Sequence, residues 1–172
     1  MKHSWIERAA TTALTGLAVF GFASAAFAGN YFFEPDLSGS ERLIENLFLI
    51  GGSLHLDHEL CESGILGAAG RGTKEVVLCV RNHQGNIGEL HDTIRHEVVH
   101  VAQGCKAERL GVERVALRPE LAIFYQGYAR DYLGWNRLGY NMDRWTTEAE
   151  ARVLATVMDQ HGIVGLLLEE CS

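Results

Sequence analysis

The pattern of apolar and polar residues after position 38 predicts a short amphipathic helix. Ser38 and Glu41 have the S-x-x-E spacing of a capping box, in which both side chains satisfy backbone N–H groups at the start of a helix. Apolar residues then recur at helical spacing; they are Leu43, Ile44, Leu47 and Phe48. We expect the pair Gly51 and Gly52 to end this helix.

A short apolar run predicts a strand in the middle of the chain. Residues 75–81 are rich in β-branched side chains and too few for a typical helix. Gly70 and Gly72 stand just before this run and are typical turn residues, so we expect a hairpin with residues 64–69. Residues 82–88 are polar and are predicted to form a loop.

A longer helix is predicted from about Glu89 to Gln103. Its apolar residues form one stripe, which consists of Leu90, Ile94, Val98 and Val101. Gly104 follows directly and is expected to cap the end of this helix. A further helical segment is expected at about 106–116.

The C-terminal part of the chain has the pattern of further helices. Pro119 is suited to the first position of one of them. Its apolar face would consist of Leu121, Phe124, Tyr125, Tyr128 and Tyr132. A loop rich in glycine and aromatic residues is expected at 134–141, and then a helix from Thr147 to about Gln160, which Gly162 would end. One helix, a hairpin and then mostly helices indicate a small α+β fold.

The N-terminal segment has the pattern of a signal peptide. Lys2 and Arg8 form a short basic start, and residues 9–26 carry no charge. Ala26 and Ala28 match the A-x-A cleavage pattern, so we expect cleavage after Ala28 and export to a periplasmic or extracellular location. Residues 29–172 would then form a single domain. In the alternative, the uncharged run stays as a membrane anchor, because it is about long enough to span a bilayer.

The charge of the chain argues against two classes of partner. Its formal net charge is -7, and its 15 Lys and Arg residues do not cluster. Nucleic acids and anionic membranes are bound through basic patches. We therefore expect no nucleic-acid partner and no stable membrane insertion once the signal peptide is removed.

The segment from His96 to His100 has the H-E-x-x-H pattern, and it lies inside a helix predicted without it. Residues four apart share one face of a helix, so both histidines can point at one metal ion. Glu97 lies beside them and can reach an attacking water without binding the metal. The sequence therefore predicts His96 and His100 as metal ligands and Glu97 as a catalytic general base.

Two histidines do not complete a catalytic zinc site, which needs three protein ligands and an open position. Lys106 stands where a third histidine would extend the motif. The downstream helix offers Glu148 and Glu150. Glu148 lies about 60° from the middle of the apolar face of that helix and Glu150 about 100° from it, so we favour Glu148 as the third ligand. Thr147 and Glu150 have capping-box spacing, which gives Glu150 another role.

The chain has four cysteines, all after the expected cleavage site. An even number in an exported chain favours two disulfides over buried free thiols. Three pairings are possible, and the sequence alone does not choose among them. We favour Cys61–Cys79, which would join the hairpin region, together with Cys105–Cys171, which would tie the C-terminal tail to the helix of the H-E-x-x-H motif.

These segments resemble the core of small H-E-x-x-H peptidases. They are most similar to the mitochondrial intermembrane-space peptidases that process an ATP synthase subunit. Those proteins have a strand ending in Leu-Cys, then Asp-Thr-Leu before H-E-x-x-H, and a cysteine five residues after the last histidine. Cys79, Asp92 and Cys105 of this chain match that pattern, whereas Gln103 stands where the family has an acidic residue.

The resemblance also bears on the third ligand. Several gluzincin groups take it from a downstream Glu-x-x-Ala motif, and residues 148–151 have that form. The resemblance thus implies a minimal zincin-like domain that binds Zn2+ through His96, His100 and Glu148 and hydrolyses peptide bonds.

This interpretation implies a peptide or protein substrate. We expect the peptide to lie extended along the edge of the strand at 75–81, as an added strand. Tyr140, Arg144 and His161 are candidates for the group that stabilises the oxyanion, and the sequence does not choose among them. Two alternatives stay open: a zinc-binding protein without activity, and a membrane-tethered assembly or processing factor that keeps residues 9–26.

Overall fold

The computed structural model describes residues 35–70, 72–121, 124, 125, 127 and 142–172. The expected signal peptide, residues 1–28, lies outside these residues. So do Tyr128, Tyr132 and the loop at 134–141, which includes Tyr140. Within the described part of the chain, no helix is both long and apolar enough to cross a membrane.

In the described part of the chain the sheet has three short strands, and the predicted hairpin supplies two of them. The strands are β1 (Ser53–Leu56), β2 (Gly67–Ala69) and β3 (Glu75–Leu78). β3 lies in the centre, antiparallel to β2 and parallel to β1. Ala68 lies opposite Val77 in the hairpin. β1 was not predicted, because its four residues carry no apolar run of their own.

The predicted strand at 75–81 is longer than the strand observed. β3 ends at Leu78, and a 3₁₀ helix, η2 (Val80–His83), follows Cys79. A second 3₁₀ helix, η1 (Glu59–Ser63), lies between β1 and β2. Cys61 lies within η1, and Cys79 stands directly before η2.

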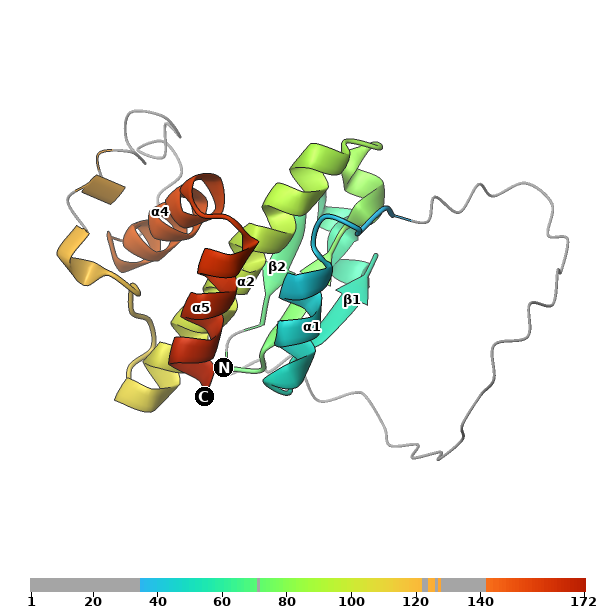
Figure 1. The fold of residues 1–172 in the computed structure, drawn as a ribbon. Helices are drawn as coiled ribbons and strands as arrows, with labels where there is room; N and C mark the ends of the chain where they lie inside the picture. Colours follow the sequence, from blue (N-terminus) through green and yellow to red (C-terminus); the bar gives the residue numbers. More distant parts are fainter. Residues whose placement is uncertain (1–34, 71, 122–123, 126, 128–141) are drawn as a thin grey trace, which may run out of the picture. The chain divides into compact units, whose positions relative to one another are not determined.

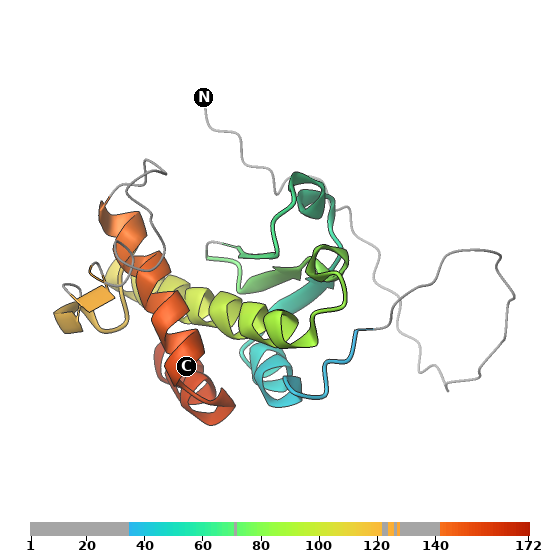
Figure 2. The ribbon, with the colours of Figure 1, turned by 90° about the horizontal axis from the view of Figure 1, so that it is seen from above.

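Among the residues that the structure describes, four α-helices pack against the sheet or against one another. They are α1 (Glu41–Leu49), α2 (Ile87–Leu110), α4 (Met142–Val157) and α5 (Gln160–Cys171). α2 packs against β2 and β3 on one side and against α4 and α5 on the other, as Figures 1 and 2 show. The α+β class is therefore confirmed, and α2 is the central element on which the other parts pack.

The predicted end of the long helix is wrong. Gly104 has no positive φ, and α2 continues through it and through the segment expected as a separate helix, to Leu110. The helix ends at Gly111, whose φ of +66° is the left-handed conformation that a glycine cap adopts. The buried stripe of Leu90, Ile94, Val98 and Val101 is confirmed.

Other helix ends also differ from the sequence predictions. In the first helix Ser40, and not Ser38, stands at the N-cap position, and its side chain makes no capping hydrogen bond. Pro119 begins only a short 3₁₀ helix, η3 (Pro119–Leu121). α4 begins before Thr147, so Thr147 is not its N-cap, and α5 begins after Asp159 with Gly162 inside it.

The two favoured disulfides are confirmed. Cys61 is bonded to Cys79, and Cys105 on α2 is bonded to Cys171 on α5. The second bond fastens the last helix to the helix that carries the H-E-x-x-H motif. Both disulfides border buried clusters of apolar side chains, so each joins segments that already pack together.

Candidate metal centre

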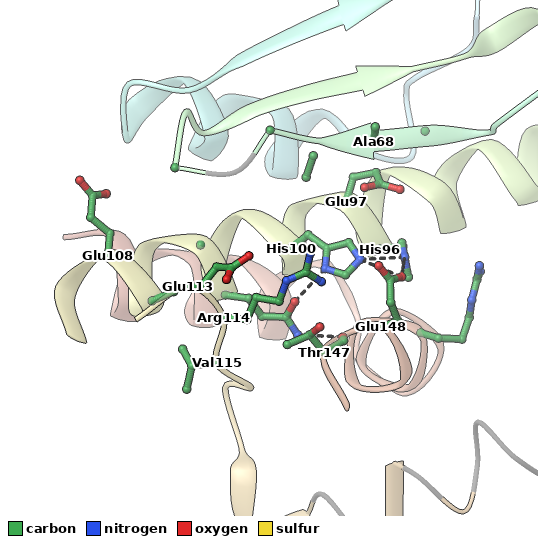
Figure 3. A pocket seen from close by; sticks show the side chains of 18 of the residues that line it. Ala68, His96, Glu97, His100, Glu108, Glu113, Arg114, Val115, Thr147 and Glu148 are labelled. Atoms are coloured by element: carbon green, nitrogen blue, oxygen red, sulfur yellow. Dashed lines mark hydrogen bonds and ion pairs between the residues drawn. The ribbon is translucent and has the colours of Figure 1, made fainter. Parts of the chain in front are cut away.

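His96 and His100 lie on one face of α2, one turn apart, and point at the same spot. Their Nε2 atoms are 3.1 Å apart, and their rings are nearly perpendicular. α2 presents this face toward α4, and Glu148 on α4 points into the same spot, as Figure 3 shows. The carboxylate oxygen Oε2 of Glu148 lies 3.5 Å from Nε2 of His96 and 3.3 Å from Nε2 of His100.

These three side chains therefore form a group that could hold a metal ion. Their donor atoms make a nearly equilateral triangle, which one cation at its centre would satisfy. A metal ligand set is also a chemical reason for two ring nitrogens to face each other, because without a proton or a cation between them their lone pairs repel. The structure thus brings together the three residues that the sequence singled out as ligands.

Glu150 does not join this group. It is fully buried, and its carboxylate accepts hydrogen bonds from the backbone N–H groups of Leu117 and Arg118, at 2.6 and 2.7 Å. The predicted capping role of Glu150 is therefore wrong, because α4 begins upstream of Thr147 and the carboxylate turns toward the segment after α2. The two glutamates point different ways, since residues two apart on a helix lie about 200° apart.

The three side chains of this group alter one another's pKa values. Burial opposes a charge on His100, but the hydrogen bond and the charge of Glu148 outweigh burial and raise the pKa of His100 to about 9. Burial alone would raise the pKa of Glu148, yet the hydrogen bonds from His100 and His96 hold that pKa far below its usual range. Burial lowers the pKa of His96 to about 4. The shifts of His100 and Glu148 thus both favour a positive charge beside the carboxylate.

Glu97 is the fourth member of the site and is almost fully buried. Burial, helped by the negative charge of Glu148, raises the pKa of Glu97 to about 7. A carboxyl group with a pKa near neutrality can both accept and return a proton at neutral pH. In Figure 3 Glu97 lies between the three metal-binding candidates and β2.

β2 approaches α2 very closely at this point. A Cβ atom added to Gly67 would lie 2.7 Å from Cγ2 of Thr93 and 3.1 Å from Cγ of Glu97. Only a glycine leaves room there, so Gly67 allows the strand to rest directly on the side chains of Thr93 and Glu97. Gly67 could not be recognised from the sequence, because no neighbouring residue distinguishes it from the other glycines between Gly64 and Gly72.

A pocket of about 730 Å³ contains the site. Its walls are β2, one face of α2, the segment 112–115 and the middle of α4, at 147–152. Glu97, His96, His100 and Glu148 all line it, and so do Arg114 and Arg152, which the sequence did not indicate. The pocket is therefore large enough to admit a ligand beside the metal-binding candidates.

The strand edge that borders this pocket is not the one we predicted. β3, which contains most of the run at 75–81, is paired on both sides and has no free edge. β2 is paired with β3 alone among the described strands, and Gly67, Ala68 and Ala69 line the pocket. An extended ligand could therefore pair with β2 but not with β3.

Several other predicted candidates lie elsewhere. His161 has an exposed side chain next to Asp159 and does not line the pocket, and the side chain of Arg144 lies outside the described residues. Two other histidines, which were not predicted as ligands, do not line the pocket either: His55 contacts Ser53, and His58 caps η1. No metal-binding group forms around His55 and His58 in the described part of the chain.

Gln103 is a functional candidate that the sequence marked only as a difference from the family that the chain resembles. It is buried, and its side-chain oxygen lies 2.7 Å from Nδ1 of His100. The sequence offered one signal for this contact. Gln103 stands three positions after His100, and residues three apart face the same side of a helix.

Comparisons of this chain with models of protein families, with curated proteins and with solved structures give no match. What the site can do is therefore argued from its own geometry.

Proposed function

We propose that this chain is an exported zinc-dependent peptidase. The observation that carries the proposal is the convergence of His96, His100 and Glu148 beside a buried glutamate, Glu97, at a pocket bordered by a free strand edge. None of these features requires a peptidase when it is taken alone. Together they supply a metal site, a base and a place for an extended peptide.

The spacing of the donor atoms supports zinc as the metal. Four ligands about 2.0–2.1 Å from a tetrahedral zinc ion lie about 3.3–3.4 Å from one another. The three distances between the donor atoms here are 3.1, 3.3 and 3.5 Å. Three protein ligands of the His, His and Glu type with one open position are typical of catalytic zinc sites, whereas structural sites use four protein ligands.

The position of Glu97 supports a role in which it accepts and then donates a proton during hydrolysis. Zinc bound at this site would polarise the scissile carbonyl and lower the pKa of the attacking water. Glu97 would accept a proton as the water oxygen bonds to the carbonyl carbon. It would then give this proton to the amide nitrogen as the carbon–nitrogen bond breaks, so that one carboxyl group serves first as base and then as acid.

The free edge of β2 supports an extended peptide as the substrate. A peptide in this position would pair with the backbone of Gly67–Ala69 and would lie between that strand and the metal-binding face of α2. Backbone pairing would hold the scissile bond in place without contacts to the side chains of the peptide, so β2 would position peptides of many sequences.

Export is supported by the two disulfides. Such bonds form and persist in oxidising compartments and are rare in the cytosol. The signal-peptide pattern of residues 1–28 points the same way.

The test uses the chain purified with its disulfides intact. Metal analysis should find one zinc ion per chain, and the protein should cleave members of a mixed peptide library, as read by mass spectrometry. A chelator should stop cleavage, and added zinc should restore it. A chain that binds zinc tightly but cleaves no peptide in the library would instead be a zinc-binding protein without activity.

A further inference from the structure

Gln103 connects the metal-binding face of α2 to α4. Its side-chain nitrogen Nε2 donates hydrogen bonds to the backbone carbonyl of Thr147, at 3.0 Å, and to Oε2 of Glu150, at 2.8 Å. Its oxygen Oε1 lies 2.7 Å from Nδ1 of His100. All of these contacts are at least partly buried, so water does not compete freely for them.

The surroundings of Gln103 determine which way its amide points. The carbonyl of Thr147 and the carboxylate of Glu150 only accept hydrogen bonds, so the end of the amide that faces them must be the NH₂ group. The oxygen of Gln103 must then face His100. Because an amide oxygen only accepts, Nδ1 of His100 has to carry a proton, and its lone pair for a metal is on Nε2.

Glu150 is itself held in place by groups that are remote from the metal site. Besides the bond from Gln103, it accepts the backbone N–H groups of Leu117 and Arg118. Three donors offset the cost of burying this carboxylate. The orientation of Gln103 is therefore set from the side of α4 and of the segment after α2, and does not depend on His100.

His96 and His100 differ in whether their Nδ1 atoms have a hydrogen-bond partner. Among the described residues, nothing accepts a hydrogen bond from Nδ1 of His96, which is buried. His100, by contrast, has its ring fixed by Gln103. Partners of this kind orient a ligand ring and typically change metal affinity about 10–100-fold.

We propose that Gln103 is a positioning residue of the metal centre: held by Glu150 and Thr147, it fixes the ring of His100 so that Nε2 faces the cation. The proposal rests on the metal binding that belongs to the proposed function, and not on peptidase activity. It also gives a reason for the fully buried glutamate on α4, which binds no metal itself.

The experiment compares two substitutions on α2. Gln103→Met keeps the size of the side chain and removes both amide contacts. Lys106→Met is the matched control, because Nζ of Lys106 also ties α2 to the segment after it, through the carbonyls of Ala116 and Leu117, at 3.2 and 2.7 Å, and does not contact His100. Zinc affinity is measured by competition with a chromophoric chelator.

We expect Gln103→Met to bind zinc about 10–100-fold more weakly than the wild type, and Lys106→Met to bind it with unchanged affinity. An equal loss in both variants would mean that Gln103 acts only by holding α2 to its neighbours, and would overturn the proposal. So would an unchanged affinity in Gln103→Met. If that variant does not fold, Gln103→Asn takes its place, because its shorter amide cannot reach both His100 and Glu150.

A second readout needs no variant. In ¹⁵N NMR spectra of the zinc-loaded wild type, His100 should be bound through Nε2, with a proton on Nδ1 that exchanges slowly with water. Binding through Nδ1, or fast exchange of that proton, would contradict the proposal. A wild-type chain that binds zinc and cleaves nothing would remove the peptidase and leave the role of Gln103 intact. One that binds no zinc would overturn both.

Discussion

Oε2 of Glu148 lies 3.3 Å from Nε2 of His100, although 48 residues separate them in the chain. The contact joins α4 to α2, and it completes the group that H-E-x-x-H leaves incomplete. It also helps to raise the pKa of His100 to about 9, since the carboxylate stabilises the protonated ring.

Glu148→Ala should leave the fold intact and remove tight zinc binding, because two histidines remain as ligands. Glu150→Ala should instead lower the stability of the fold. It would leave three N–H donors without an acceptor, and each buried donor without a partner costs about 1–3 kcal/mol of unfolding free energy. Chemical denaturation and zinc titration of both variants separate the two effects. A Glu150→Ala protein of wild-type stability would contradict this account of the buried carboxylate.

Glu97→Gln should bind zinc as the wild type does and lose most of its peptidase activity. The amide cannot accept the proton of the attacking water, and general-base catalysis contributes about 10²–10⁴-fold in rate. Metal analysis and the peptide-cleavage rate are measured on the same sample. Cleavage at the wild-type rate would show that another group is the base.

Zinc affinity should rise with pH. In the metal-free protein the pKa of His100 is raised to about 9, so its ring holds a proton at neutral pH that zinc must displace. Below that pKa the proton competes with zinc, and each unit of higher pH should strengthen binding by up to about tenfold. Above it the dependence should level off. Chelator competition from pH 6.5 to 9.5 measures this slope, and an affinity that does not change over this range would refute the pairing of His100 with Glu148.

The two disulfides should contribute unequally to stability. They close loops of 18 and 66 residues, and the chain-entropy model assigns about 3 and about 4 kcal/mol to loops of these lengths. Replacing Cys105 and Cys171 by alanine should therefore lower the unfolding free energy more than replacing Cys61 and Cys79. Urea denaturation of the two double variants provides the comparison, and the opposite order would show that strain or denatured-state structure outweighs loop length.

Gly67→Ala should reduce activity while zinc stays bound. The added methyl group would press on Thr93 and Glu97 and would also come within 3.1 Å of the carbonyl of Val77, so β2 has to move away from α2. Ala68→Gly is a control on the same strand that adds no atom. Zinc content and peptide cleavage are measured for both, and full activity in Gly67→Ala would mean that β2 does not help to position the substrate.

Local signals in the sequence were enough for much of this site. The apolar stripe of α2 and the spacing of His96 and His100 follow from the same helical period, so finding the helix also placed both histidines on one face. The phase of the next long helix favoured Glu148 over Glu150 for the same reason. The α+β class was also predicted. The two cysteine pairings were favoured, but the sequence alone did not choose among the three possible ones, and the structure shows the favoured pair.

Three features were decided only by tertiary structure. Gly104 does not end α2, because the helix is held along its length by the sheet, α4 and α5, and this packing outweighs the modest cost of a glycine inside a helix. β3 is the central strand, because β1 pairs with it from more than 20 residues upstream, with Ser53 opposite Glu75. The free edge beside the pocket is therefore that of β2.

The sequence by itself determined which residues could form the metal site, because ligand type and helical spacing are local properties of the chain. It did not determine what surrounds them. Glu150 looked like a helix cap and is a buried carboxylate, since its partners at Leu117 and Arg118 come from a segment without any periodic pattern. The role of Gln103 depends in turn on that carboxylate. Contacts between distant segments form only when the helices pack, and they decide how the site is held.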